Sequence, residues 1–223
     1  HINTIEFFHP QGNSLPGKVL NELASKITHA GEDPETRVII LRSAGDRAFC
    51  AGASFDELAA IKTEKEGLEF FSGFAKVINA IRMCPKFVIG RIHGRCVGGG
   101  VGLAAAVDYA IAYSAAEIKL SELAIAIGPF VVGPAVERKM GVSAFSQLAI
   151  DASMWRSAEW ARKRGLFAEV YAEMEDMEEA IRRLADTLMH SSPEAMAELK
   201  KVFWKGTEHW DKLLVDRAAI SGR

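Results

Sequence analysis

The feature that most constrains this chain is a glycine-rich junction between an apolar segment and a run of helix formers. The apolar segment, Phe87 to Ile92, predicts a buried strand, and Gly98 to Gly100 separate it from the helix formers Val101 to Val107. A helix that begins at such glycines presents backbone N–H groups with no Cβ in front of them. The junction is therefore either a site for an anion or a developing oxyanion, or a closely packed turn.

The order of the predicted elements indicates an α/β protein. Apolar runs predict strands at 2–8, 37–42, 87–92, 109–113 and 118–123, and periodic apolar stripes predict helices from Pro16 to Gly31 and from Glu66 to Met83. Beyond Gly128 only helices are expected, at 136–140, 143–152, 157–164, 177–190 and 193–203. We therefore divide the chain into an α/β core at residues 1–135 and a helical region at residues 136–223.

Composition narrows the classes of function. The formal net charge of −2 on 223 residues gives no reason to expect nucleic-acid binding. The three cysteines, Cys50, Cys84 and Cys96, lack the number and spacing of a disulfide framework or zinc site, which predicts a reducing compartment and a cytoplasmic location. The histidine spacing predicts no metal, and no apolar run approaches the ~20 residues of a membrane span. Because the chain starts at His1, we expect it to be trimmed.

The glycine-rich junction also matches a dinucleotide-binding pattern. Gly100-Val-Gly102-Leu-Ala-Ala105 fits G-x-G-x-x-A after a strand. That pattern normally follows the first strand of its fold, and the strand expected at 109–113 does not end in the required acidic residue. It also leaves the small-residue segment Cys50 to Leu58 unexplained. A dehydrogenase-like protein is the weaker interpretation.

A second pair of motifs gives a better account of the chain. Phe49-Cys-Ala-Gly-Ala53, followed by His93-Gly and Gly98-Gly-Gly-Val-Gly-Leu103, resembles the crotonase (enoyl-CoA hydratase/isomerase) superfamily, with Ser121-Glu122 and Gly128-Pro129 downstream. The resemblance implies a spiral of ββα turns over residues 1–135 and a trimerisation region over 136–223. It also implies an acyl-CoA substrate, a homotrimer or hexamer, and no cofactor apart from the coenzyme A of the substrate.

The resemblance also assigns candidate site residues. The N–H groups of Ala53 and Gly99 would form an oxyanion hole for the thioester oxygen, and Glu122 would be the catalytic acid/base. Its apolar neighbours Leu120, Leu123 and Ile125 predict a raised pKa. The residues expected to bind substrate are Cys50, Ala51, Gly52, Phe55, Gly98, Gly102 and Phe130.

One departure from the family pattern bears on the reaction. Hydratases of this family usually carry two glutamates, and the position of the first is Gly102 here. A single base can move a proton between two carbons on one face of the substrate. The absence of the first glutamate at Gly102 therefore favours double-bond isomerisation, while hydration by Glu122 alone stays open. The alternative from another class is a non-catalytic CoA-binding or interaction protein that keeps the fold.

Three other candidates have structural interpretations. We expect Asp108 to bond to nearby backbone and His93 to be a packing or turn residue. Lys200, Lys201 and Lys205 with Trp204 form a basic-aromatic set that could meet CoA phosphates, but a solvated helix face is the expected arrangement because lysines are mostly exposed.

Overall fold

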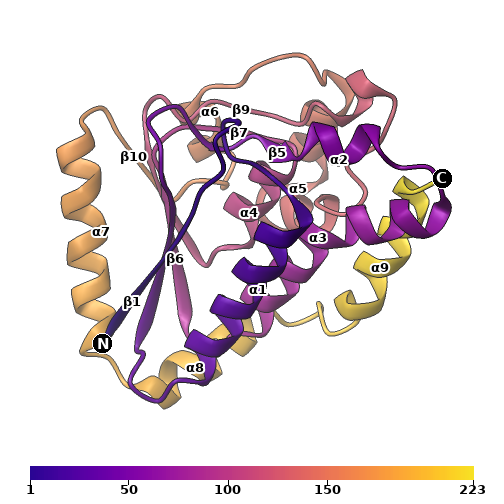
Figure 1. The fold of residues 1–223 in the computed structure, drawn as a ribbon. Coiled ribbons are helices and arrows are strands. Elements are labelled where there is room, and N and C mark those ends of the chain that lie inside the picture. The colour runs from indigo at the N-terminus through magenta and orange to yellow at the C-terminus, as the bar shows by residue number, and fades with distance from the viewer.

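The computed structural model describes residues 1–223 and is built on three parallel sheets (Figure 1). The largest has the strand order β1-β3-β6-β8-β10, and smaller sheets are formed by β4-β7-β9 and by β2-β5. The strands are β1 (Ile2–Phe7), β2 (Ser14–Leu15), β3 (Val38–Ser43), β4 (Ala48–Cys50), β5 (Gly52–Ala53), β6 (Phe87–Ile92), β7 (Arg95–Val97), β8 (Tyr109–Tyr113), β9 (Ile118–Lys119) and β10 (Glu169–Tyr171).

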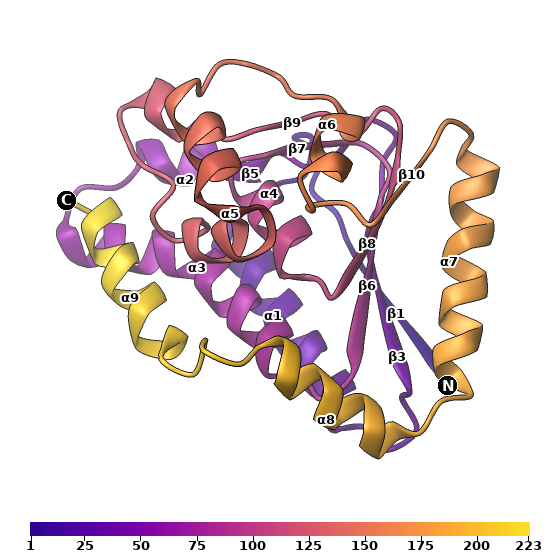
Figure 2. The same ribbon diagram turned by 180° about the vertical axis from the view of Figure 1, so that it is seen from behind.

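Helices lie on both faces of the largest sheet and at one of its ends (Figures 1 and 2). The helices are α1 (Gly17–Glu32), α2 (Phe55–Ala59), α3 (Glu64–Met83), α4 (Gly99–Ala106), the 3-10 helix η1 (Glu122–Ile125), α5 (Gly133–Ile150), α6 (Ala158–Lys163), α7 (Met174–Met189), α8 (Pro193–Phe203) and α9 (Trp210–Ser221). The predicted α/β class is confirmed by this arrangement.

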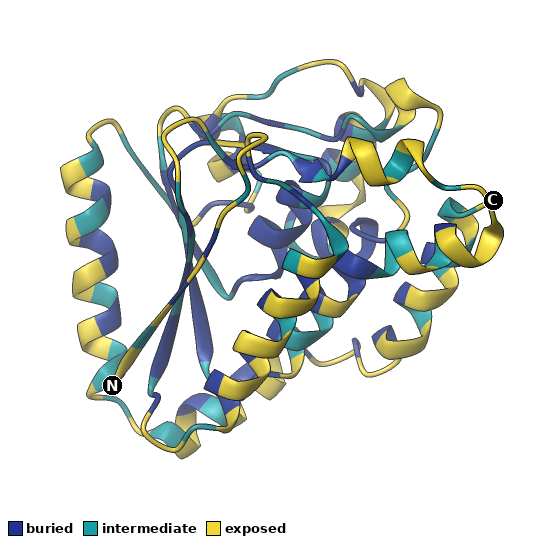
Figure 3. Ribbon diagram, in the orientation of Figure 1, coloured by how far each residue is buried: buried dark blue, intermediate teal, exposed yellow.

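The central strands β3 and β6 are buried on both faces, which explains their continuous apolar runs, whereas every second residue of the edge strand β1 is exposed. Along β3, Val38 faces α7 and belongs to a small cluster with Met177, whereas Ile39 faces α1 and α3 in the main core. Successive side chains of a strand point to opposite faces, so both faces need an apolar cover. Figure 3 shows the central strands and the inward faces of these helices largely in the colour of buried residues.

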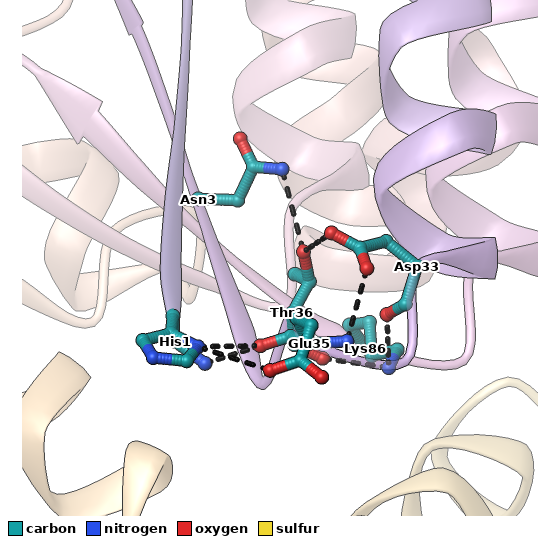
Figure 4. A network of polar contacts seen from close by, with 6 residues as sticks. All are labelled: His1, Asn3, Asp33, Glu35, Thr36 and Lys86. Atoms are coloured by element: carbon teal, nitrogen blue, oxygen red, sulfur yellow. Dashed lines mark hydrogen bonds and ion pairs between the residues drawn. The ribbon is translucent and has the colours of Figure 1, made fainter.

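A polar network fixes one end of this sheet (Figure 4). Lys86 Nζ donates to the backbone oxygens of Asp33 (3.2 Å) and Thr36 (2.6 Å), and the Thr36 hydroxyl donates to the Asp33 carboxylate (3.0 Å). The amino group of His1 donates to the Glu35 oxygen. The turn between α1 and β3 is thereby joined to the starts of β1 and β6.

The structure corrects two predictions about elements and confirms a third. In the segment 118–123, only Ile118–Lys119 is a strand, and Glu122 begins η1 instead. The region 136–223 is not wholly helical, because β10 pairs in parallel with β8 at the edge of the largest sheet. The break expected between the helices at 136–140 and 143–152 is confirmed at Gly141, where α5 has the non-helical angles φ 78° and ψ 165°.

The structure also places the basic-aromatic set differently from the prediction. Lys200 and Trp204 are buried, and Lys200 Nζ lies 2.8 Å from Asp108 Oδ2. Trp204 Nε1 donates to the other oxygen of Asp108 at 3.0 Å, and Val88 N–H donates to Oδ2 at 2.8 Å. The Val88 bond confirms the backbone role expected for Asp108. Lys200 is an internal ion-pair partner and not part of a solvated face.

Candidate functional site

A cavity of about 100 Å³ lies where the two small-residue loops meet α3 and the segment before α5. Its wall is mostly apolar, and the only ionisable side chain in it is Glu122. The lining residues are Ala51, Gly52, Ala53, Phe55, Leu58, Phe70, Phe71, Phe74, Val97, Gly98, Gly99, Ser121, Glu122, Ile125, Ile127, Gly128, Pro129, Phe130, Val131, Val132 and Ser221.

Glu122 is a carboxylate held in an apolar environment. Its Oε1 atom is buried and has no hydrogen-bond partner. Burial disfavours the charged form and raises the pKa of Glu122 from 4.5 to about 7. A group with this pKa is neither fully protonated nor fully ionised near neutral pH, as proton transfer in both directions requires.

Gly98 makes room for this carboxylate. Its φ of +55° lies in the region that favours glycine, and a Cβ at this position would lie 3.1 Å from Glu122 Oε1. Gly98 N–H donates to the carbonyl of Lys119 (3.0 Å), which holds the junction against the strand that leads to Glu122. The glycine at position 98 therefore serves both the backbone turn and the position of the Glu122 side chain.

The cavity is also lined by Ala53 and Gly99, the two residues whose backbone N–H groups are the expected oxyanion donors. Gly99 is the first residue of α4, so its N–H has no acceptor within the helix, and the positive end of the helix dipole lies beside it. On either side of Ala53, the N–H groups of Ala51 and Ser54 donate to the carbonyls of Asn13 (3.1 Å) and Leu15 (3.2 Å), which joins this segment to β2. A backbone N–H without an acceptor can bind an oxygen that gains negative charge.

The two loops come together because their residues are small. A Cβ on Gly100 would lie 2.1 Å from the carbonyl oxygen of Cys50, and one on Gly52 would lie 3.1 Å from the carbonyl oxygen of Val97. Glycine at both positions lets the backbone after β4 pack directly against the start of α4. This contact sets the distance between Ala53 and Gly99.

Most of the predicted substrate-binding residues lie at the cavity, and two do not. Ala51, Gly52, Phe55, Gly98 and Phe130 line it, together with Ala53, Gly99 and Glu122. Cys50 is fully buried behind the wall, where burial raises the pKa of its thiol to about 12. Gly102 is also buried outside the wall, one turn further along α4. Cys50 and Gly102 therefore differ from the other five residues, because both pack behind the lining residues.

Sequence reasoning missed part of the cavity wall. Phe70, Phe71 and Phe74 belong to the apolar stripe of α3, which predicted only core packing, yet all three line the cavity. The sequence feature that could have indicated their role at the cavity is the number of phenylalanines in this one helical stripe. Val132 also lines the cavity, beside α4.

The remaining candidates lie outside the cavity. Both ring nitrogens of His93 are buried without a hydrogen-bond partner, and burial lowers the pKa of this histidine, which fits the expected packing role. The structure contains no cluster of three histidine, cysteine or acidic side chains that could hold a metal ion. None of its helices has the length and apolarity required to cross a membrane.

Known proteins share this arrangement. The enoyl-CoA hydratase/isomerase family model matches residues 1–218. Carnitinyl-CoA dehydratase of Proteus mirabilis (strain HI4320) is 30% identical over 203 residues, which cover 87% of this chain and 73% of that protein. The mitochondrial methylglutaconyl-CoA hydratase of Homo sapiens is 32% identical over 200 residues, which cover 88% of this chain and 58% of that protein.

Solved structures agree with the sequence comparisons. A crystal structure of enoyl-CoA hydratase from Bacillus anthracis matches with a TM-score of 0.85 and 30% identity, over 100% of this chain and 86% of that one. An enoyl-CoA hydratase from Mycobacterium smegmatis matches with a TM-score of 0.87 and 26% identity, over 93% and 80%. The predicted crotonase fold is confirmed. The chain belongs to the enoyl-CoA hydratase/isomerase family and is an enzyme that acts on acyl-CoA thioesters.

Proposed function

We propose that this enzyme shifts a carbon–carbon double bond in an acyl-CoA thioester, with Glu122 as the single acid/base. The observation that carries the proposal is that Glu122 is the only ionisable side chain of the cavity and has a pKa raised to about 7. Isomerisation needs one group that first removes a proton and then returns it.

The reaction proceeds in two steps. The Glu122 carboxylate removes a proton from C2 of a 3-enoyl thioester, and the electron pair moves onto the thioester oxygen as C1 and C2 become doubly bonded. The N–H groups of Ala53 and Gly99 bind that oxygen, and one such donor typically contributes about 2.7–4 kcal/mol. Protonated Glu122 then gives its proton to C4, and the double bond lies between C2 and C3.

The acyl group that fits the cavity is short and uncharged. The cavity of about 100 Å³ contains no lysine, arginine or histidine that would pair with a second carboxylate. Its apolar wall includes Phe70, Phe71 and Phe74, which favour a hydrocarbon group. The coenzyme A part of the substrate lies outside this cavity and requires no separate cofactor.

Hydration of a 2-enoyl thioester by Glu122 alone is the second candidate. It is favoured by the names of two relatives, a dehydratase and a hydratase. This reaction needs a base for water and an acid for C2, and the cavity wall provides one carboxylate. The two candidates differ in their product, which separates them in one assay.

We also propose that the protein assembles as a homotrimer or a pair of trimers, as the family resemblance implies. Val142, Ile150 and Met154, in and just after α5, are 63%, 75% and 49% exposed, which supports an apolar subunit contact in the region 136–223. Light scattering coupled to size-exclusion chromatography gives the mass that tests this assembly.

The test is an assay of 3-enoyl-CoA and 2-enoyl-CoA with the wild-type protein and Glu122→Gln. We expect double-bond migration without 3-hydroxyacyl-CoA, and a loss of roughly 10²–10⁴-fold in Glu122→Gln, the usual contribution of a general acid/base. Glu117→Gln is the matched control, because Glu117 is partly exposed and paired with Arg95. Full activity of Glu122→Gln contradicts the proposal. Binding of acyl-CoA without turnover by the wild type favours a binding protein.

A further inference from the structure

We propose that Val132 determines which reaction this site performs, because its side chain occupies the space that a second carboxylate at position 102 would need. The proposal rests on the proposed function and deepens it. Position 102 lies on α4 and Val132 lies just before α5, so the two residues come from separate elements that pack together. Gly102 and Val132 therefore lie against each other where α4 packs on α5.

The distances at this contact leave no room for a side chain on α4. A Cβ on Gly102 would lie 2.5 Å from Val132 Cγ1 and 2.9 Å from Val132 Cβ. Real Cβ contacts are not this short, so even alanine requires a displacement. The next neighbour, Ile78 Cδ1, lies at 3.7 Å, an ordinary contact. Val132 is therefore the obstacle.

Val132 is also held in place by its backbone. Its carbonyl accepts the N–H of Val136 at 3.1 Å, and the N–H of Gly133 donates to the Pro129 carbonyl at 3.0 Å. Val132 is 5% exposed and has the helical backbone angles φ −79° and ψ −19°. Because the start of α5 is fixed in this way, a larger residue at 102 gains space only if the side chain at 132 becomes smaller.

Val132 reaches the cavity, so its side chain acts on the chemistry as well as on packing. Hydration forms a bond between the water oxygen and C3, moves a water proton to a base, and delivers a proton to C2. Water needs polar partners to be held in a buried site, and the isopropyl group of Val132 offers none. The isopropyl group of Val132 lines the wall beside position 102, where the second carboxylate would hold that water.

Four proteins test the role of Val132: the wild type, Gly102→Glu, Val132→Ala and the double variant Gly102→Glu/Val132→Ala. We expect 3-hydroxyacyl-CoA formation from 2-enoyl-CoA to be at least about 100-fold faster in the double variant than in either single variant, as a second general acid/base provides. The matched control is Gly102→Gln/Val132→Ala, which has the same shape without the carboxylate and should show no gain.

If Gly102→Glu does not fold, the melting temperatures of alanine variants at positions 102 and 132 test the same contact. Gly102→Ala should lower the melting temperature, and adding Val132→Ala should recover most of the loss, whereas two unrelated truncations would lower it further. Hydration by Gly102→Glu alone at the rate of the double variant overturns the proposal, as does a folded double variant no better than its glutamine control. Failure of the proposed function is seen separately, as rapid hydration without double-bond migration by the wild type.

Discussion

At the scale of single residues, the site depends on one buried carboxylate and on the glycine beside it. Glu122 was predicted from the family resemblance, and its apolar neighbours in sequence predicted a raised pKa, which the structure confirms. The contact between Gly98 and Glu122 could not be predicted, because it joins two loops whose approach depends on the whole fold. The same is true of Gly102 and Val132.

The raised pKa of Glu122 predicts the pH dependence of the reaction. The first step requires the carboxylate form, so kcat/KM should rise with pH and level off above an apparent pKa of about 7. The measurement is kcat/KM for 3-enoyl-CoA from pH 5 to pH 9. A profile already level at pH 5.5 would show that Glu122 is either not the base or not desolvated in the free enzyme.

The contact at Gly98 predicts a positioning effect. In Gly98→Ala the new Cβ lies 3.1 Å from Glu122 Oε1 and the backbone has a φ of +55°, so we expect kcat to fall by roughly 10²-fold with a smaller change in KM. Gly12→Ala is the matched control, since Gly12 has a φ of +66° and no atom near its Cβ position. Equal losses of activity in both variants would mean that only backbone strain matters.

At the scale of elements, the long strands and helices were predictable and the short ones were not. β3 and β6 are apolar runs buried on both faces, and α3 has a clear apolar stripe. β2, β5, β9 and β10 have only two or three residues each, too few for any periodicity to identify a strand. These short strands exist because a neighbouring strand pairs with them.

The burial of Lys200 on α8 was missed for a related reason. Lys200 looks like a solvated residue in the sequence, because its partner Asp108 is 92 positions earlier in the chain. The carboxylate of Asp108 is in turn satisfied by Val88 N–H and Trp204 Nε1. Such a pair forms only when α8 packs against β6, beside the segment that follows α4.

The Asp108–Lys200 pair predicts a large effect on stability. Lys200→Met leaves the carboxylate of Asp108 buried without its cation, which costs about 3–5 kcal/mol when one partner of a buried pair is lost. Lys201→Met is the control, because the Lys201 side chain is 74% exposed, and its effect should stay within ~0.5 kcal/mol. Urea unfolding gives both values, and a loss below ~1 kcal/mol for Lys200→Met would show that Asp108 does not need the cation.

At the scale of the whole molecule, the carboxylate of the site reduces the stability of the fold at neutral pH. The folded state holds a proton on Glu122 up to about pH 7, whereas the unfolded state releases it near 4.5, so the free energy of unfolding falls as pH rises through this window. A shift of this size corresponds to at most about 3 kcal/mol.

Glu122→Gln should remove this dependence on pH. We expect the variant to be more stable than the wild type at pH 8 and the difference to shrink toward pH 4.5, because the neutral amide has no desolvation cost of a charge. Denaturant unfolding at pH 5 and at pH 8 measures this difference. A constant difference between the two proteins would mean that Glu122 titrates equally in the folded and unfolded chains.

The position of Lys200 and Trp204 in the chain has a consequence for how the protein is made. α4 carries the Gly99 N–H at its start, and Asp108 follows its end, where the carboxylate is held by residues 200 and 204. During synthesis that carboxylate has no cation until α8 has left the ribosome. We therefore expect α4 to become rigid only after α8 has been made, so a nascent chain that still lacks residues 200 and 204 should not yet have an ordered site.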